Sequence, residues 1–248
     1  ISQEVELGDV IATLNLEPSS VEIIPAGMRL GMDGGMFVEE SAECIAEFDP
    51  GYSAAIESDP PRIGSSPPEV GNFHAGIHLS DDFGNQALYS VWRGGLLCYD
   101  IDAETAGFPL DTSILGLMAG DAFDPLFPDS KPLLIHTSPE KPPTLEYAGE
   151  NDVVVVVEDL GLQFYAELDH RETLMLGMGL NVDAGIDLPF DGTTGELAIG
   201  VQLAGEDVVA TVTDNEFVPD ANAAIEENFA GVFDTLVGSI VGGLVEDL

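Results

Sequence analysis

The stretch TLMLGMGLNVDAGIDL, residues 173–188, decides the fold that this sequence predicts. Apolar side chains stand at every second position from Leu174 to Leu188, with glycine at several of the positions between them. Alternation with period two predicts a β-strand with one apolar face, and a strand of this length spans ~50 Å when straight. Glycines inside a strand favour strong bending. The sequence therefore predicts a long, curved strand whose apolar face covers a core.

A long helix is predicted at the end of the chain, starting at about Asp220. Its apolar residues form one broad stripe over about five turns and would span ~40 Å. Because the helix and the strand have similar lengths, the simplest packing lays the helix along the concave face of a coiled sheet. The stripe consists of Ile225, Phe229, Val232, Phe233, Leu236, Val237, Ile240, Val241, Leu244 and Val245.

The segments around the long strand complete an antiparallel meander in this interpretation. Short apolar runs and turn signals such as Asp191-Gly192 predict strands at 133–135, 153–157, 160–169, 196–203 and 208–212. The fold class is therefore predicted to be α+β, with a highly curved antiparallel β-sheet wrapped around one long amphipathic helix.

The first third of the chain has a different organisation. Residues 5–38 alternate apolar and polar side chains and predict two or three strands, whereas residues 39–72 are acidic and proline-rich and predict a linker. Ser80 is a good N-cap for a helix that ends at Gly94-Gly95, and a strand is expected at 96–101.

The charge excludes whole classes of function. Asp and Glu number 46 against 6 Lys and Arg, for a formal net charge of −40. Such a surface repels nucleic acid and anionic lipid headgroups, so no nucleic-acid partner is expected. It is typical of a halophilic-like protein that stays soluble at high salt. Calcium binding is the alternative, but Asp81-Asp82 and Asp100-x-Asp102 lack the full calcium-loop pattern.

The residues that often perform chemistry form no site in this sequence. Cys44 and Cys98 have no metal-ligand spacing and are either a disulfide candidate or two buried thiols. His74 and His78 would lie ~13 Å apart along a strand, too far for one metal ion. No nucleophile motif or phosphate loop occurs. We therefore predict no catalytic residue, no metal, no cofactor and no enzymatic activity.

The stretch IHLSDDFGNQAL, residues 77–88, and its continuation to Gly95-Leu96-Leu97 resemble the C-terminal barrel of the bactericidal/permeability-increasing protein family. In that family a strand ending in Leu-Ser leads to a helix that carries an aromatic residue, an Asn and an Ala and ends at a Gly. The later order of strands and the terminal helix is also similar. The resemblance covers residues 74–248 as a barrel, and residues 1–73 would match the central sheet and a linker.

The resemblance implies a tubular lipid-binding fold outside the cytoplasm, in the periplasm, at the cell surface or secreted. Apolar lipid would lie in a hydrophobic tube between helix and sheet and would be bound, with transfer as a further role, without catalysis. A second barrel domain or a protein partner would contact residues 1–38, and peripheral membrane contact is compatible with such a fold. The scarcity of basic residues departs from the family members that bind endotoxin and favours an uncharged acyl chain or a sterol-like ligand.

The expected lining follows from the apolar faces of these elements. Glycines beside the terminal helix and flexible Leu and Met on the strand favour a cavity that tolerates variable ligands. The alternative is an acidic extracellular structural or assembly module, in which the same side chains form a packed barrel used as a scaffold. The predicted lining residues are Phe83, Ala87, Val91, Leu174, Leu176, Met178, Leu180, Phe229, Phe233, Val237 and Ile240.

Overall fold

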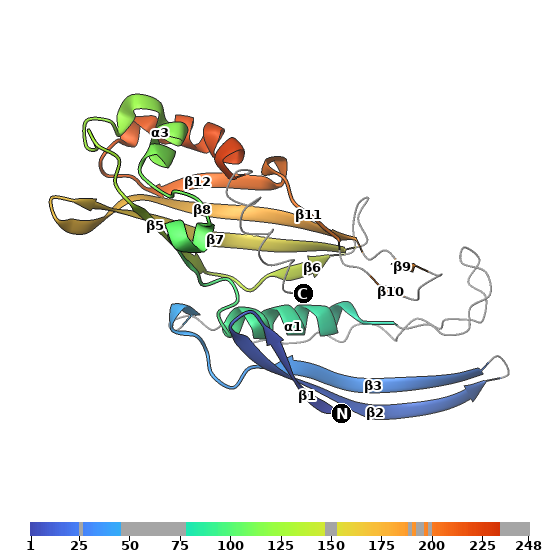
Figure 1. The fold of residues 1–248 in the computed structure, drawn as a ribbon. Helices are drawn as coiled ribbons and strands as arrows, with labels where there is room; N and C mark the ends of the chain where they lie inside the picture. The colour runs from blue at the N-terminus through green and yellow to red at the C-terminus, as the bar shows by residue number, and fades with distance from the viewer. Residues whose placement is uncertain are drawn as a thin grey trace.

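The computed structural model describes residues 1–24, 27–45, 78–146, 153–187, 190–191, 196–197 and 200–233. It confirms the α+β class: a three-stranded sheet and a curled seven-stranded sheet, both antiparallel, pack with a small number of helices, and two short strands form a separate pair (Figure 1). The boundary predicted at residues 73 and 74 lies outside the described residues, so the division into two domains stays a prediction.

The first sheet has three strands, as the alternation over residues 5–38 predicted. They are β1 (Ser2–Leu7), β2 (Val10–Ile24) and β3 (Gly27–Phe37), in the order β1-β2-β3. A two-residue turn joins β1 to β2, and Gly8 takes a φ of 57° there, which a residue without Cβ adopts without strain. The β2–β3 register shifts between Pro18 and Ser20, where β2 carries one extra residue.

The second sheet has the order β11-β8-β7-β5-β4, with β12 also paired to β8 and β6 paired to β7. Asp169 and His170, both with positive φ, form the tight turn of the central β7–β8 hairpin. The strands are β4 (Asp100–Ile101), β5 (Leu133–Pro139), β6 (Thr144–Glu146), β7 (Val153–Leu168), β8 (Arg171–Asp187), β11 (Gly200–Gln202) and β12 (Val208–Asp214). Two short strands, β9 (Phe190–Asp191) and β10 (Glu196–Leu197), pair with each other.

The strand expected at 96–101 is wrong for its first half, because only Asp100–Ile101 is a strand. The backbone N–H of Leu96 bonds to Val91 O, and the N–H of Cys98 bonds to Gly95 O. These bonds turn the chain back toward the preceding helix, so the N–H groups of Leu96 and Cys98 cannot pair with a neighbouring β-strand.

The long strand β8 is confirmed, but its predicted single apolar face is wrong at one end. Phe164 of β7 pairs with Leu176, and the next residue, Tyr165, pairs with Leu174. Met175 is therefore the extra residue of a β-bulge, which shifts the alternation by one position. Met175 is buried in the core at 1% exposure, whereas Leu174 is half-buried and lies outside the core cluster.

Two groups of helices occupy different places (Figure 1). The helix α3 (Ser113–Ala119) and a helix over 222–233 lie on one side of the seven-stranded sheet, while α1 (Asp81–Arg93) lies between the two sheets and packs on β3 and β6. The remaining short helices are η1 (Glu43–Ile45), α2 (Ala103–Ala106), η2 (Gly120–Ala122), η3 (Gly205–Asp207) and η4 (Pro219–Ala221). None of the helices in these described ranges is long and apolar enough to cross a membrane.

Candidate functional site

The structure divides the predicted lining residues into separate groups. Five of them meet in the main core, where side chains of β8 pack against the helix over 222–233. Phe229 and Phe233 are in ring contact at 5.9 Å between centroids. All five are buried, so here they form a packed wall. These five are Leu176, Met178, Leu180, Phe229 and Phe233, whereas Val237 and Ile240 lie outside the described residues.

Three further lining residues lie on α1, apart from that core. Phe83, Ala87 and Val91 are four residues apart and share one face of the helix. Phe83 and Ala87 are half-buried, and only Val91 is buried, at 5% exposure. The helix begins as the sequence predicted, because Ser80 Oγ accepts a hydrogen bond of 3.2 Å from Phe83 N.

One neighbouring face of α1 is held to the three-stranded sheet by hydrogen bonds. Gln86 Oε1 accepts from Met36 N at 2.7 Å, and its Nε2 donates to Met36 O. Ser90, one turn further on, also donates to Met36 O. The sequence analysis missed this contact, since nothing in the local pattern around Gln86 indicates a partner fifty residues earlier.

Another face of α1 is held to the seven-stranded sheet. Asn85 Oδ1 accepts from Leu145 N at 2.7 Å, and Trp92 Nε1 donates to Pro139 O at 3.0 Å. At about 100° of turn per residue, the stripe of Phe83, Ala87 and Val91 lies between the two hydrogen-bonded faces. Polar contacts therefore fix α1 to both sheets on faces other than the apolar stripe.

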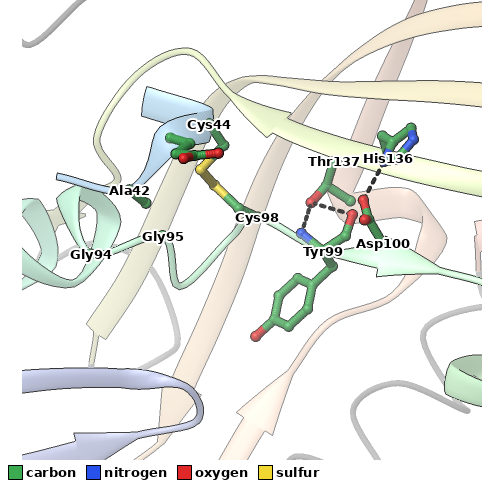
Figure 2. A pocket seen from close by; sticks show the side chains of 10 residues that line it. Ala42, Cys44, Gly94, Gly95, Cys98, Tyr99, Asp100, His136 and Thr137 are labelled. Atoms are coloured by element: carbon green, nitrogen blue, oxygen red, sulfur yellow. Dashed lines mark hydrogen bonds and ion pairs between the residues drawn. A yellow bond between two sulfur atoms is a disulfide. The ribbon is translucent and has the colours of Figure 1, made fainter. Parts of the chain in front are cut away.

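A hollow of about 510 Å³ lies beside the two cysteines, which form a disulfide (Figure 2). His136 Nδ1 pairs with Asp100, and the His136 ring meets Tyr165 edge-on at 5.1 Å. Burial raises the pKa of Tyr99, and the charge of Asp9 raises it further. The hollow combines a sulfur bridge with polar groups, so it does not suit an apolar chain.

The Thr137 hydroxyl, which also lines this hollow, is already occupied by backbone groups. Thr137 Oγ1 accepts from Tyr99 N at 2.7 Å (Figure 2). It also donates to Leu97 O. A hydroxyl held in this way is not available as a nucleophile for His136. The described lining of this hollow therefore contains no base–nucleophile pair.

A second hollow, of about 350 Å³, lies on the face of the seven-stranded sheet away from the core. Gly161 and Gly179 are paired across β7 and β8, and Gly177 lies beside them, so the sheet lacks side chains there. Leu174 lines this hollow. The bulge at Met175 thus removes Leu174 from the lining group in which the sequence had placed it.

Charged side chains on the described surface are mostly acidic, and Arg29 and Lys141 are paired with acidic side chains. Lys141 Nζ lies 2.8 Å from Asp159 and 3.0 Å from Glu158. Hydrogen bonds to Asp159 and then to Glu158 raise the pKa of Lys141. Within the described ranges, no group of three His, Cys, Asp or Glu is placed to hold a metal ion.

No family model and no curated protein matches this chain. Among solved structures it is similar to the crystal structure of lipopolysaccharide binding protein, at 10% sequence identity and a TM-score of 0.41, over 97% of this chain. The chain spans 46% of the length of that protein. At this TM-score, the likeness supports no conclusion about a superfamily or a ligand.

Proposed function

We propose that this protein binds an uncharged apolar lipid, an acyl chain or a sterol-like molecule, between α1 and the seven-stranded sheet, without catalysis. The observation that carries the proposal is the apolar stripe of Phe83, Ala87 and Val91. An amphipathic helix is normally attached through its apolar face. Here hydrogen bonds to Met36, Leu145 and Pro139 attach the helix on other faces, which leaves an apolar stripe for a ligand.

The core side chains of β8 and the helix over 222–233 would support the sheet from its other side and would not touch the ligand (Figure 1). Each buried CH₂ group of a ligand contributes about 0.8 kcal/mol, so a chain of about ten carbons needs no polar contact to bind tightly. Val237 and Ile240 continue the apolar stripe of the terminal helix in sequence, and we include them in the proposed lining.

The disulfide between Cys44 and Cys98 supports an extracytoplasmic location, because disulfides persist in oxidising compartments. The net charge of −40 supports an uncharged ligand over an anionic one, since an anionic headgroup would be repelled.

The rival function is an acidic structural or assembly module with a fully packed barrel. It is favoured by the close packing of Leu176, Met178 and Phe229, each 1% exposed or less. Native mass spectrometry of the purified full chain, followed by organic extraction, separates the two. We expect a co-purifying lipid, or stoichiometric uptake of an added long-chain fatty alcohol or sterol. A chain that carries nothing and takes up neither probe would be the scaffold.

A further inference from the structure

The closed end of the β2–β3 hairpin exposes a concentrated group of large apolar side chains. Val21 is 64% exposed, Ile23 85%, Met28 71% and Leu30 50%. We call these four residues the hairpin patch. Most of the other large apolar residues that are exposed in the described ranges lie elsewhere in the fold as separate side chains. A contiguous apolar patch on a soluble domain indicates an interaction surface.

The register places the whole patch on one face of the hairpin. Val21 pairs directly with Leu30, and Ile23 pairs with Met28. Directly opposed residues share a face, as do residues two apart on one strand. The four side chains are therefore neighbours on one side of a two-stranded ribbon, at the end that extends beyond α1 (Figure 1). The contact of α1 with Met36 lies toward the other end of this hairpin.

The opposite face of the same ribbon neutralises its own charge. Glu22 pairs with Arg29 across the strands, and their side chains form an ion pair at 2.8 Å. These two residues are the only charged ones from Pro18 to Met32 in the sequence. The hairpin end thus has no net charge, in a chain whose total is −40.

We propose that the hairpin patch inserts into an uncharged, zwitterionic lipid surface. The charge distribution selects this occupant. A second copy of the chain would bring another −40 into contact, and an anionic membrane would repel the remainder of the protein. A zwitterionic lipid surface has no net charge and so repels neither the hairpin nor the acidic remainder of the protein. Apolar side chains on a charge-neutral element enter the boundary between headgroups and acyl chains. Among the described residues, the two strands of the ribbon pair with each other along their inner edges only. Their open outer edges therefore restrict insertion to the headgroup boundary, where water and polar groups satisfy them.

The biological role of the hairpin patch rests on the proposed function, since the patch would be where lipid is collected or released. The exposure and charge observations that support insertion do not depend on that function. The test is co-sedimentation of the full chain with phosphatidylcholine vesicles at about 0.15 M salt, where long-range repulsion is screened beyond about 8 Å. We expect binding that weakens as phosphatidylglycerol is added. The Ile23→Ser/Met28→Ser variant should lose about tenfold or more in vesicle affinity.

The matched control is the Val209→Ser/Leu117→Ser variant. Val209 is 64% exposed on β12 and Leu117 is 67% exposed on α3. The control therefore removes two exposed apolar side chains that lie outside the hairpin. This variant should bind vesicles as the wild type does. Equal losses in both variants, or a wild type that ignores phosphatidylcholine, would overturn the proposal. So would a concentration-dependent dimer that the Ile23→Ser/Met28→Ser change dissolves without any effect on vesicles.

The Ile23→Trp variant keeps an apolar side chain and gives a second measurement if the double variant fails to fold. Its added emission should shift to the blue with phosphatidylcholine vesicles and be quenched by brominated acyl chains, and an unshifted spectrum would count against insertion. Bound lipid without vesicle binding would contradict only the hairpin proposal. Vesicle binding by a chain that holds no lipid would contradict only the proposed function.

Discussion

Gln86 of α1 bonds to both backbone groups of Met36: its amide oxygen accepts from the N–H, and its amide nitrogen donates to the C=O. Met36 lies on β3, an edge strand of the three-stranded sheet. The side-chain amide therefore satisfies part of a strand edge that would otherwise be open to another chain.

This contact predicts that Gln86→Ala destabilises the protein. The change leaves the N–H of Met36 without its partner in a partly buried place, at a cost of about 1–3 kcal/mol. Urea denaturation followed by circular dichroism measures the loss. Gln3→Ala, at an exposed position of β1, is the control and should leave the midpoint unchanged. Equal midpoints for both variants would show that the contact does not stabilise the fold.

The bulge in β8 predicts opposite results at two adjacent residues. Met175 is buried in the core, so Met175→Ser should cost about 2–5 kcal/mol. Leu174 lies on the other face beside an open hollow, and Leu174→Ser should cost clearly less. Thermal unfolding of the two variants compares them directly. A larger loss of stability for Leu174→Ser than for Met175→Ser would contradict the bulge and indicate that the apolar alternation continues unbroken through Leu174.

The disulfide between Cys44 and Cys98 closes a loop of 54 residues and should contribute substantially to stability. A loop of this size corresponds to about 4 kcal/mol in the chain-entropy account. The Cys44→Ala/Cys98→Ala variant should unfold at correspondingly lower denaturant. Reductant should destabilise the wild type and leave the double variant unaffected. A wild type that is insensitive to complete reduction would contradict this expectation.

The apolar stripe of α1 predicts that Ala87→Trp reduces lipid uptake. The larger side chain would fill space that the ligand is proposed to occupy, and affinity for a fluorescent fatty alcohol should fall about tenfold, as the loss of about 1.4 kcal/mol of contact implies. Displacement fluorescence measures the affinity. Leu117→Trp, on the exposed side of α3, is the control. Unchanged affinity in Ala87→Trp would move the binding site away from α1.

Acid should weaken two helix starts. A hydrogen bond from the N–H of Thr105 lowers the pKa of Asp102 from its usual value, and a hydrogen bond from the hydroxyl of Ser113 lowers the pKa of Asp111. Because the folded pKa is lowered, this stabilisation is complete above the unfolded pKa and is lost as pH falls through the folded one. Asp102→Asn keeps a capping side chain without a titrating group. Its denaturation midpoint should therefore fall less than that of the wild type below about pH 4.

Much of the fold could be predicted from the sequence because its signals are local. The alternation from Thr173 to Asp187 predicted β8, Ser80 and Gly94 bounded α1, and the composition predicted the acidic surface. Each of these depends on residues within a few positions of one another, where backbone geometry alone relates spacing to face.

How the predicted lining residues group in the fold could not be predicted, because grouping depends on contacts between distant segments. Leu176 and Phe229 share the core as the pattern suggested, but Phe83 and Ala87 lie on a separate helix against other strands. The sequence also left the state of Cys44 and Cys98 open, and the structure joins them. No local pattern predicts that Asn85 and Gln86 bond α1 to the two different sheets.

By itself the sequence determined the strand and helix periods, the helix caps and the total charge, since these follow from neighbours along the chain. Only the tertiary structure decided that Met175, and not Leu174, enters the core, because a bulge exists only relative to the strand that pairs with it. It also decided that Ile23 and Met28 are exposed. Their apolar character is written in the sequence, but exposure depends on what packs against the hairpin, which no local pattern contains.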